Sequence, residues 1–440
     1  MSSIEKQKKA IEELEDVEYV MRPEFSSFVN FSQARNAPIH RWFKYREGFS
    51  PDLVNAFLSN QEKRVLDPFC GCGTTLVSSM QKGIDSIGID INPLATFVSS
   101  VKTRHYTSND IEKLREFSKD ALDADLTVNP AEPPELKIIN KVFPKDVLDY
   151  LLSVKAYINS VPESNLRDFL FLGWLAILER VSNTRKEGNG IKYRSTRRTK
   201  KGYVHIPFDI WQREYYGNDQ KTFVRSRLEE QFNMMLADIK KCFLRPFPCK
   251  ASVHRSDAVL LDEILNEEKI SLAIFSPPYA NCFDYFEIFK VELWMGNFID
   301  SYTHLKNLRK DSFGSLWQMH RDNNMDEYVS KFVHLIQEKE LWDKKIISML
   351  AAYFSNMRIV LSKIYEALFP KGRCVIVVGN SAYSNVLIPT DLLLARIGRQ
   401  LGFRSPKLII ARHLTTSSQQ KKKLTQLKQY LRESIIVLEK

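Results

Sequence analysis

Short apolar runs alternate along the chain with longer stretches in which apolar residues recur every three or four positions. The short runs predict buried strands, and the longer stretches predict helices that bury one face. Strands are predicted over residues 64–67, 85–90, 251–257, 270–275, 374–379, 407–411 and 434–438. Helices are predicted over residues 4–16, 74–81, 166–181, 348–368 and 391–401. This order of strands and helices is typical of an α/β protein with a mostly parallel sheet.

Two stretches interrupt the alternation. Residues 108–250 have a mostly helical pattern that includes a proline-rich polar segment, and residues from about 296 to 345 are polar and helical. We therefore predict one α/β domain that carries a large helical insertion and a smaller second insertion. The large insertion divides the domain into residues 1–107 and 251–440.

The first two predicted strands flank a turn that contains two glycines. Gly71 and Gly73 let the backbone turn tightly and approach a ligand, and the following helix offers its N-terminal N–H groups. Asp90 closes the next strand, at a distance along the chain that suits an acid binding ribose hydroxyls. The turn lacks the lysine of a phosphate loop, and its start at Asp67 suits a cationic ligand without phosphate. The two glycines alone are equally compatible with an ordinary tight turn.

A second motif, Ser276-Pro277-Pro278-Tyr279, follows the predicted strand at 270–275. An amino group on an aromatic base is a poor nucleophile, because its lone pair is delocalised into the ring. The Ser276 hydroxyl and the Pro277 carbonyl could both accept from that group, and two prolines hold such acceptors rigidly. Tyr279 offers a flat face for stacking a base. Taken alone, the four residues also fit a proline turn with a structural tyrosine.

Both motifs resemble those of one enzyme family. Asp67-Pro68-Phe69-Cys70-Gly71-x-Gly73-Thr74-Thr75 resembles the S-adenosylmethionine-binding motif of amino-group DNA methyltransferases, with Cys72 in place of the usual serine. Ser276 to Tyr279 resembles the catalytic motif of the same family. Its serine form is most similar to that of cytosine-N4 enzymes, whereas adenine-N6 enzymes more often carry aspartate there.

The resemblance implies further site residues. The segment 88–95 is similar to the part of the family that carries the ribose-binding acid, and the segment 40–51 is similar to the part that closes over the methionine end of the cofactor. The implied S-adenosylmethionine site consists of Tyr45, Phe49, Asp67, Pro68, Phe69, Gly71, Gly73, Thr74, Thr75, Asp90, Ile91 and Asp257. The implied catalytic residues are Ser276, Pro277, Pro278 and Tyr279. Asp284 and Tyr285 would lie beside the base, and the reaction would need no metal.

The family's fold is a Rossmann-like, doubly wound class I methyltransferase sheet of seven strands. The resemblance therefore implies that residues 1–107 form the cofactor-binding part and residues 251–440 the catalytic part. It implies that the helical insertion at 108–250 recognises the DNA target, because few residues follow the last predicted strand.

Charge supports a nucleic-acid partner. The chain has a net charge of +11, which favours a polyanion. Basic residues cluster between positions 185 and 201, with Tyr193 and Tyr203 interleaved or adjacent and with Gly188 and Gly190 in the same segment. We predict a pliable loop that contacts DNA phosphates. The predicted contacts are Arg185, Lys192, Arg194, Arg197, Arg198 and Lys200. Asn183, Asn189 and Arg194 could read base edges, and a solvated basic loop is the alternative interpretation.

Other classes of protein find little support in the sequence. Six scattered cysteines fit reduced thiols rather than a disulfide framework, and Cys70-x-Cys72 lacks a second pair of zinc ligands. The residues around Cys249 do not resemble the motif of cytosine-5 enzymes. With no apolar stretch of transmembrane length and no signal-peptide pattern at Met1–Lys6, we expect a cytoplasmic protein that has no membrane partner.

The sequence therefore predicts an enzyme that methylates cytosine N4 in double-stranded DNA by flipping the base out of the helix. Adenine N6 in DNA is the close alternative. RNA base methylation and a non-catalytic DNA-recognition subunit are less well supported. A cognate restriction endonuclease or a defence-system protein would be a fitting partner.

Overall fold

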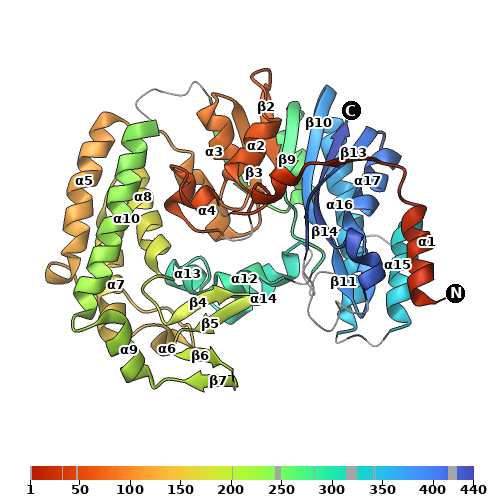
Figure 1. The fold of residues 1–440 in the computed structure, drawn as a ribbon. Helices are drawn as coiled ribbons and strands as arrows, with labels where there is room; N and C mark the ends of the chain where they lie inside the picture. Colours follow the sequence, from red (N-terminus) through yellow and green to blue (C-terminus); the bar gives the residue numbers. More distant parts are fainter. Residues whose placement is uncertain are drawn as a thin grey trace.

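Figure 1 shows the computed structural model as a central sheet covered by helices on both faces, with a helical arm to one side. The structure describes residues 2–31, 33–45, 48–200, 202–242, 249–281, 283–313, 325–339, 341, 343–414 and 424–440. Part of the smaller predicted insertion therefore lies outside the described residues.

The sheet has the strand order β1-β13-β14-β10-β9-β2-β3-β8. The strands are β1 (Glu18–Met21), β2 (Arg64–Asp67), β3 (Asp85–Asp90), β8 (Ala251–Arg255), β9 (Ile270–Phe275), β10 (Leu368–Gly379), β13 (Arg404–His413) and β14 (Arg432–Glu439). All neighbouring strands are parallel except that β14 runs antiparallel to both β10 and β13. The predicted count of seven was wrong, because the short strand β1 adds an eighth strand beside β13.

The central strands are apolar on both faces. In β10, Cys374, Ile376 and Val378 face one hydrophobic cluster, whereas Val375 and Val377 face another. This alternation follows from the two-residue repeat of a strand, and it explains why the run at 374–379 contains no polar residue.

Helices of the α/β domain cover both faces of the sheet. One face packs against α1 (Ser3–Glu12), α11 (Leu261–Leu265), α15 (Glu327–Gln337), α16 (Lys345–Ala367) and α17 (Thr390–Gln400). Elements on the other face are η1 (Pro23–Ser27), α2 (Pro51–Phe57), α3 (Thr74–Gln81) and α4 (Pro93–Lys102). A hairpin of β11 (Ser381–Tyr383) and β12 (Val386–Ile388) follows β10.

The chain between α4 and β8 forms the arm in Figure 1. Its helices are α5 (Ser108–Leu122), α6 (Ile139–Val142), α7 (Lys145–Ser160), α8 (Ser164–Ile177), α9 (Phe208–Tyr216) and α10 (Gln220–Cys242). Two hairpins lie between α8 and α9, formed by β4 (Thr184–Glu187) with β5 (Gly190–Tyr193) and by β6 (Thr196–Thr199) with β7 (Gly202–His205). The basic stretch is therefore a pair of hairpins and not the predicted loop.

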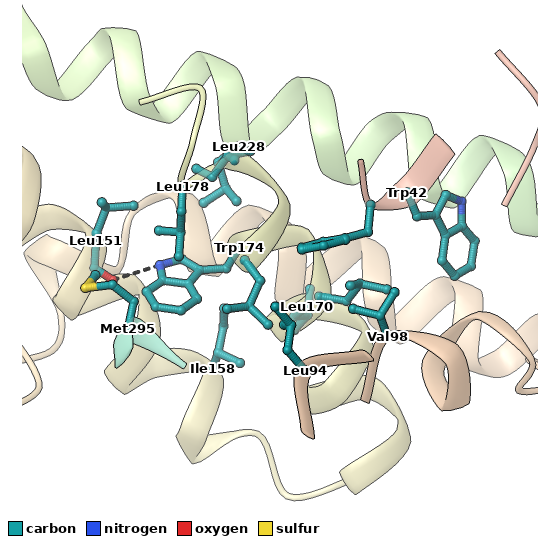
Figure 2. Packing of buried hydrophobic residues seen from close by; sticks show 14 of the residues in the cluster. Trp42, Leu94, Val98, Leu151, Ile158, Leu170, Trp174, Leu178, Leu228 and Met295 are labelled. Atoms are coloured by element: carbon teal, nitrogen blue, oxygen red, sulfur yellow. Dashed lines mark hydrogen bonds between the residues drawn. The ribbon is translucent and has the colours of Figure 1, made fainter. Parts of the chain in front are cut away.

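The arm shares one hydrophobic core with the sheet domain. Figure 2 shows Leu94 and Val98 of α4 in the same cluster as Leu170 and Trp174 of α8. Trp174 is fully buried, and its indole N–H donates to the carbonyl of Leu151 at 3.0 Å. Because α4 follows β3 directly, the arm packs against the helix behind one edge of the sheet.

Three helices connect β9 to the lower part of the arm in Figure 1. They are α12 (Tyr285–Ile288), α13 (Lys290–Met295) and α14 (Tyr302–Asp311). Among the residues that the structure describes, no helix is long and apolar enough to cross a membrane.

We expect Trp174→Ala to lower the stability of the whole chain by about 3–5 kcal/mol, since it removes a large buried side chain and leaves a cavity. Thermal unfolding followed by circular dichroism would measure the shift. Because the arm and the sheet share a core, the single transition should move as a whole. The control is Tyr203→Ala, at a side chain that is 68% exposed, which should change stability by less than about 0.5 kcal/mol. Separate transitions for arm and sheet would contradict the shared core.

Candidate active site

A cavity lies where the strand order reverses. From β2 the chain proceeds to β3 and β8 on one side, and then returns to β9 and β10 on the other side. The carboxyl ends of β2 and β9 are therefore neighbours with a crevice between them, which is where open α/β sheets bind ligands. The cavity is lined by Tyr45, Gly48, Phe49, Asp67, Pro68, Phe69, Cys70, Gly71, Cys72, Thr74, Asp90, Ile91, Asn92, Ser256, Asp257, Ala258, Ser276, Pro278, Tyr285, Phe286, Asp311, Ser312 and Phe313.

The structure brings most of the predicted cofactor residues together in this cavity. Of that set, only Gly73 and Thr75 do not line it, and both lie directly behind its wall. Thr75 instead donates its hydroxyl to the carbonyl of Ile274 at 3.3 Å, which ties α3 to β9. The two sequence motifs, about 200 residues apart along the chain, thus face the same space.

Two glycines shape the turn after β2. Gly71 and Gly73 have φ angles of +49° and +81°, which side chains rarely adopt. A Cβ atom at Gly71 would lie 3.1 Å from the Tyr45 ring, and one at Gly73 would lie 2.9 Å from the Ser99 hydroxyl. Ser99 of α4 also donates to the carbonyl of Gly71 at 2.7 Å, so the helix fixes the turn from behind.

Asp90 ends β3 opposite this turn. Its carboxylate accepts backbone N–H groups from Gly71 at 2.9 Å and Asn92 at 2.8 Å, one at each oxygen. Burial raises the pKa of Asp90 to about 6, although these hydrogen bonds act in the opposite direction. Each oxygen still has a free lone pair, so the group can accept from hydroxyls of a ligand.

Asp67 ends β2 and is almost fully buried. Burial raises the pKa of Asp67 to about 7, against hydrogen bonds from Thr75 and from the backbone N–H of Phe69. The nearby Asp90 carboxylate raises that pKa further. Two carboxyl groups in one partly closed cavity favour a cationic ligand, which would stabilise their ionised forms.

Tyr45 forms the wall that faces Gly71. Its ring stacks on Phe289, with ring centroids 4.8 Å apart and an interplanar angle of 9°. Phe289 lies between α12 and α13, and sequence reasoning did not single it out.

Ser276 follows β9 and lines the cavity. Its hydroxyl donates to the carbonyl of Val377 in β10 at 3.1 Å. The same hydroxyl is within hydrogen-bonding reach of Tyr279, and its oxygen can still accept a further hydrogen bond. The loop beyond is held by Ser381 and Tyr383, which both donate to the carbonyl of Ala280, at 2.6 and 2.7 Å.

Tyr279, which was predicted to stack against the base, is not among the residues that line this cavity. Its ring packs against Gly379, where a Cβ atom would lie 2.8 Å from the ring. Its hydroxyl donates to Glu433 of β14 at 2.5 Å, and Glu433 also pairs with Arg412. Burial and the Glu433 carboxylate raise the pKa of Tyr279 well above its usual value.

Several lining residues escaped the sequence reasoning. Asp311 ends α14, and Ser312 and Phe313 follow it, in the region that was predicted to be a polar insertion. Phe313 contacts the ring of Phe69 edge-on at 5.0 Å. No periodicity marks them as ligand-facing, because they lie at the end of an amphipathic helix.

Cys249, the alternative nucleophile, lies outside the cavity, and burial raises its thiol pKa.

The hairpins place the basic residues on different faces. Lys192, Arg197, Arg198 and Lys200 are exposed. Arg197 pairs with Glu214 at 2.8 Å, and the partly exposed Arg185 pairs with Glu187 at 2.8 Å.

Two residues in or beside these hairpins are committed to the fold of the arm. Arg194 donates to the carbonyls of Ser182 and Glu179 at 3.1 and 3.2 Å. Asn183 is buried and bonded to Lys141 and Ser195, so the prediction that it reads base edges was wrong.

Metal chemistry has no ligand set in the part of the chain that the structure describes. No group of three or more His, Cys, Asp or Glu side chains there could hold a metal ion.

Comparisons with known proteins agree with this architecture. The model of the N6/N4 methyltransferase family, described as a DNA methylase, matches residues 52–96. The type II methyltransferase M.BsoBI of Geobacillus stearothermophilus is 26% identical over an alignment of 478 positions, which covers 99% of this chain and 91% of that protein. M.AvaI of Nostoc sp. is 24% identical over 87% of this chain and 82% of its own length. M.MjaII of Methanocaldococcus jannaschii is 41% identical over 92 residues, which cover 20% of this chain and 17% of that protein.

Sheet order, cavity position and the glycine turn together define a mixed α/β domain with a large, mostly parallel sheet and a ligand site where its strand order reverses. These comparisons support an amino-group DNA methyltransferase of the N4/N6 family, with S-adenosylmethionine as the methyl donor. The cavity fits that cofactor. The two carboxyl groups would stabilise a cationic ligand, and the glycine turn leaves open a space that side chains would fill.

The raised pKa of Asp67 gives the cofactor-free protein a testable pH dependence. A carboxyl pKa raised from 3.8 to about 7 means that the folded state binds a proton more readily than the unfolded chain. The free energy of unfolding therefore falls as pH rises through this window. Asp67→Asn removes the ionisation, so the variant should be more stable than the wild type above pH 7, by a few kcal/mol. Denaturant unfolding at several pH values measures this difference, which should vanish below pH 3.8. A difference that is independent of pH would contradict the burial of an ionisable Asp67.

Proposed function

We propose that this protein transfers a methyl group from S-adenosylmethionine to the exocyclic N4 of cytosine in double-stranded DNA. The observation that carries the proposal is that Ser276, whose hydroxyl is hydrogen-bonded to the carbonyl of Val377, lines the same cavity as Asp67 and Asp90. The Ser276 hydroxyl is an uncharged acceptor. Such an acceptor suits an amino group whose lone pair must leave the ring system and localise on nitrogen before the nitrogen can attack the methyl group. Bound S-adenosylmethionine supplies an electrophilic methyl group on its sulfonium.

The residues of the chain would position and polarise the amino group. Ser276 and the carbonyl of Pro277 would accept its two hydrogens, which favours a tetrahedral nitrogen with a localised lone pair. The prolines at 277 and 278 hold both acceptors in place, so little reorganisation would be needed during the reaction. Orientation of nitrogen against methyl carbon would then supply much of the rate.

A role for Tyr279 in stacking the base would require its ring to present one face to the bound base. The contact with Gly379 occupies the other face, and the bond to Glu433 fixes the ring plane. We therefore propose that Tyr279 acts as a wall of the base site. Tyr285 and Phe286 of α12 already line the cavity and are candidates for the opposite wall.

We further propose that the arm, residues 108–250, recognises the DNA target and that duplex DNA delivers the base by flipping, at a cost of a few kcal/mol. The exposed residues Lys192, Arg198 and Lys200 would contact phosphates, together with Arg185 and Arg197. Figure 1 places both hairpins on the side of the sheet where α12 lies, which supports this assignment. We do not assign a phosphate contact to Arg194.

Two similar proteins, M.BsoBI and M.AvaI, are type II methyltransferases, which supports a role in a restriction–modification system with a cognate endonuclease. Adenine N6 is the second candidate reaction. The cavity does not distinguish the two bases, and the preference for cytosine rests on serine at position 276.

Nucleoside analysis of DNA treated with the purified protein and labelled S-adenosylmethionine tests the reaction. We expect N4-methylcytosine, and N6-methyladenine alone would contradict the proposal. Ser276→Ala should reduce the rate by at least about tenfold, because one acceptor for the amino group is lost. Cofactor affinity should stay within about twofold in the same variant, which separates catalysis from binding.

DNA contact by the hairpins can be tested through salt dependence. Each phosphate contact contributes about 0.9 to the slope of log affinity against log salt concentration. Arg198→Ala should weaken duplex binding and reduce that slope by about one. Lys407→Ala, on the distant strand β13, removes the same charge and should leave the slope unchanged. Equal slopes for the wild type and Arg198→Ala would remove Arg198 from the interface.

A further inference from the structure

One lysine of the basic hairpins points into the protein. In the β4–β5 hairpin Arg185 pairs in register with Lys192, and Lys186 pairs with Ile191. Neighbouring positions of a strand face opposite sides, so Arg185 and Lys192 lie on one face and Lys186 on the other. The Lys186 side chain is only 4% exposed.

Lys186 is held there by two acids. Its ammonium group forms a hydrogen-bonded ion pair with Glu292 of α13, and it lies 3.7 Å from Glu179. Glu292 is equally buried. A buried charge is retained only where a partner compensates its lost hydration, so the pair fixes the distance between β4 and α13.

The same ammonium group connects the hairpin to the cofactor cavity. Lys186 Nζ lies 4.2 Å from the centroid of the Phe289 ring, and the ring of Tyr45 stacks on that ring. Phe43 also contacts Phe289, with ring centroids 6.1 Å apart. Tyr45 in turn packs against Gly71 in the cofactor turn. Three consecutive contacts therefore lead from the hairpin to the cofactor cavity.

We propose that Lys186 is a positioning residue that couples DNA binding at the β4–β5 hairpin to cofactor binding at Tyr45. The outer face of β4 and β5 carries Arg185 and Lys192, and phosphates bound there restrain the strand from which Lys186 projects inward. The restrained strand holds Phe289 and Tyr45 in the arrangement that closes the cofactor turn. By reciprocity, bound cofactor strengthens DNA binding by the same factor. This inference rests on the proposed DNA interface.

Calorimetric titration with S-adenosylhomocysteine, in the presence and absence of a saturating mixed-sequence duplex, measures the coupling. This ligand undergoes no methyl transfer, so the result does not depend on which base is methylated. We expect the duplex to tighten binding to the wild-type protein by at least about fivefold. Lys186→Met should weaken binding without DNA by about fivefold or more, because the support of Phe289 is lost.

Two further variants separate coupling from folding and from charge. Lys186→Met combined with Glu292→Met replaces the ion pair by apolar side chains and should keep the thermal midpoint near that of the wild type. Its ratio of affinities with and without duplex should fall to about one. Lys192→Met removes the same charge from the outer face, so it should weaken duplex binding and leave the affinity for S-adenosylhomocysteine alone unchanged.

A wild-type ratio retained by the folded double variant would overturn the coupling, as would a wild-type protein whose cofactor affinity is the same with and without DNA. Unchanged duplex affinity in Lys192→Met would instead show that the proposed DNA interface is misplaced.

Discussion

The direction of the strands is the constraint on which the rest of this structure depends. β2, β3, β8, β9 and β10 run parallel, so their carboxyl ends meet at one edge of the sheet, and the reversal of order between β2 and β9 leaves space there. Burial on both faces leaves the central strands β9 and β10 with mostly apolar residues near their carboxyl ends. The polar residues that end them then become neighbours, although the glycine turn and Ser276 are far apart in the sequence.

The cavity is built from groups that the fold alone would not favour. Asp67 and Asp90 end buried strands where their ionised forms lose hydration, and the turn between them needs two backbone conformations that suit glycine. A cation between the carboxyl groups would offset this cost. The buried carboxylates therefore destabilise the cofactor-free protein. A bound cation would remove this unfavourable electrostatic energy, and its removal would strengthen binding.

Sequence reasoning was most successful where burial dictates the residues. The strands at 64–67, 85–90 and 270–275 and the helix at 74–81 have the bounds that were predicted, because apolar runs between turn residues leave few alternatives. β1 was missed since its residues are mostly exposed and lie at the sheet edge. The hairpins were missed because basic residues on their outer faces hide the two-residue repeat. The places of Phe289 and Phe313 depend on tertiary packing, which leaves no local signal.

The bond between Tyr279 and Glu433 has a consequence for how the protein is made. The two residues are 154 positions apart, and the acceptor lies on β14, which inserts between β10 and β13. On the ribosome, the glycine turn and its supporting helices can assemble long before β14 has been synthesised. Until that strand enters the sheet, the Tyr279 hydroxyl lacks the Glu433 carboxylate that holds it. A nascent chain could thus acquire a nucleoside pocket early, while its chemistry would wait for one late strand.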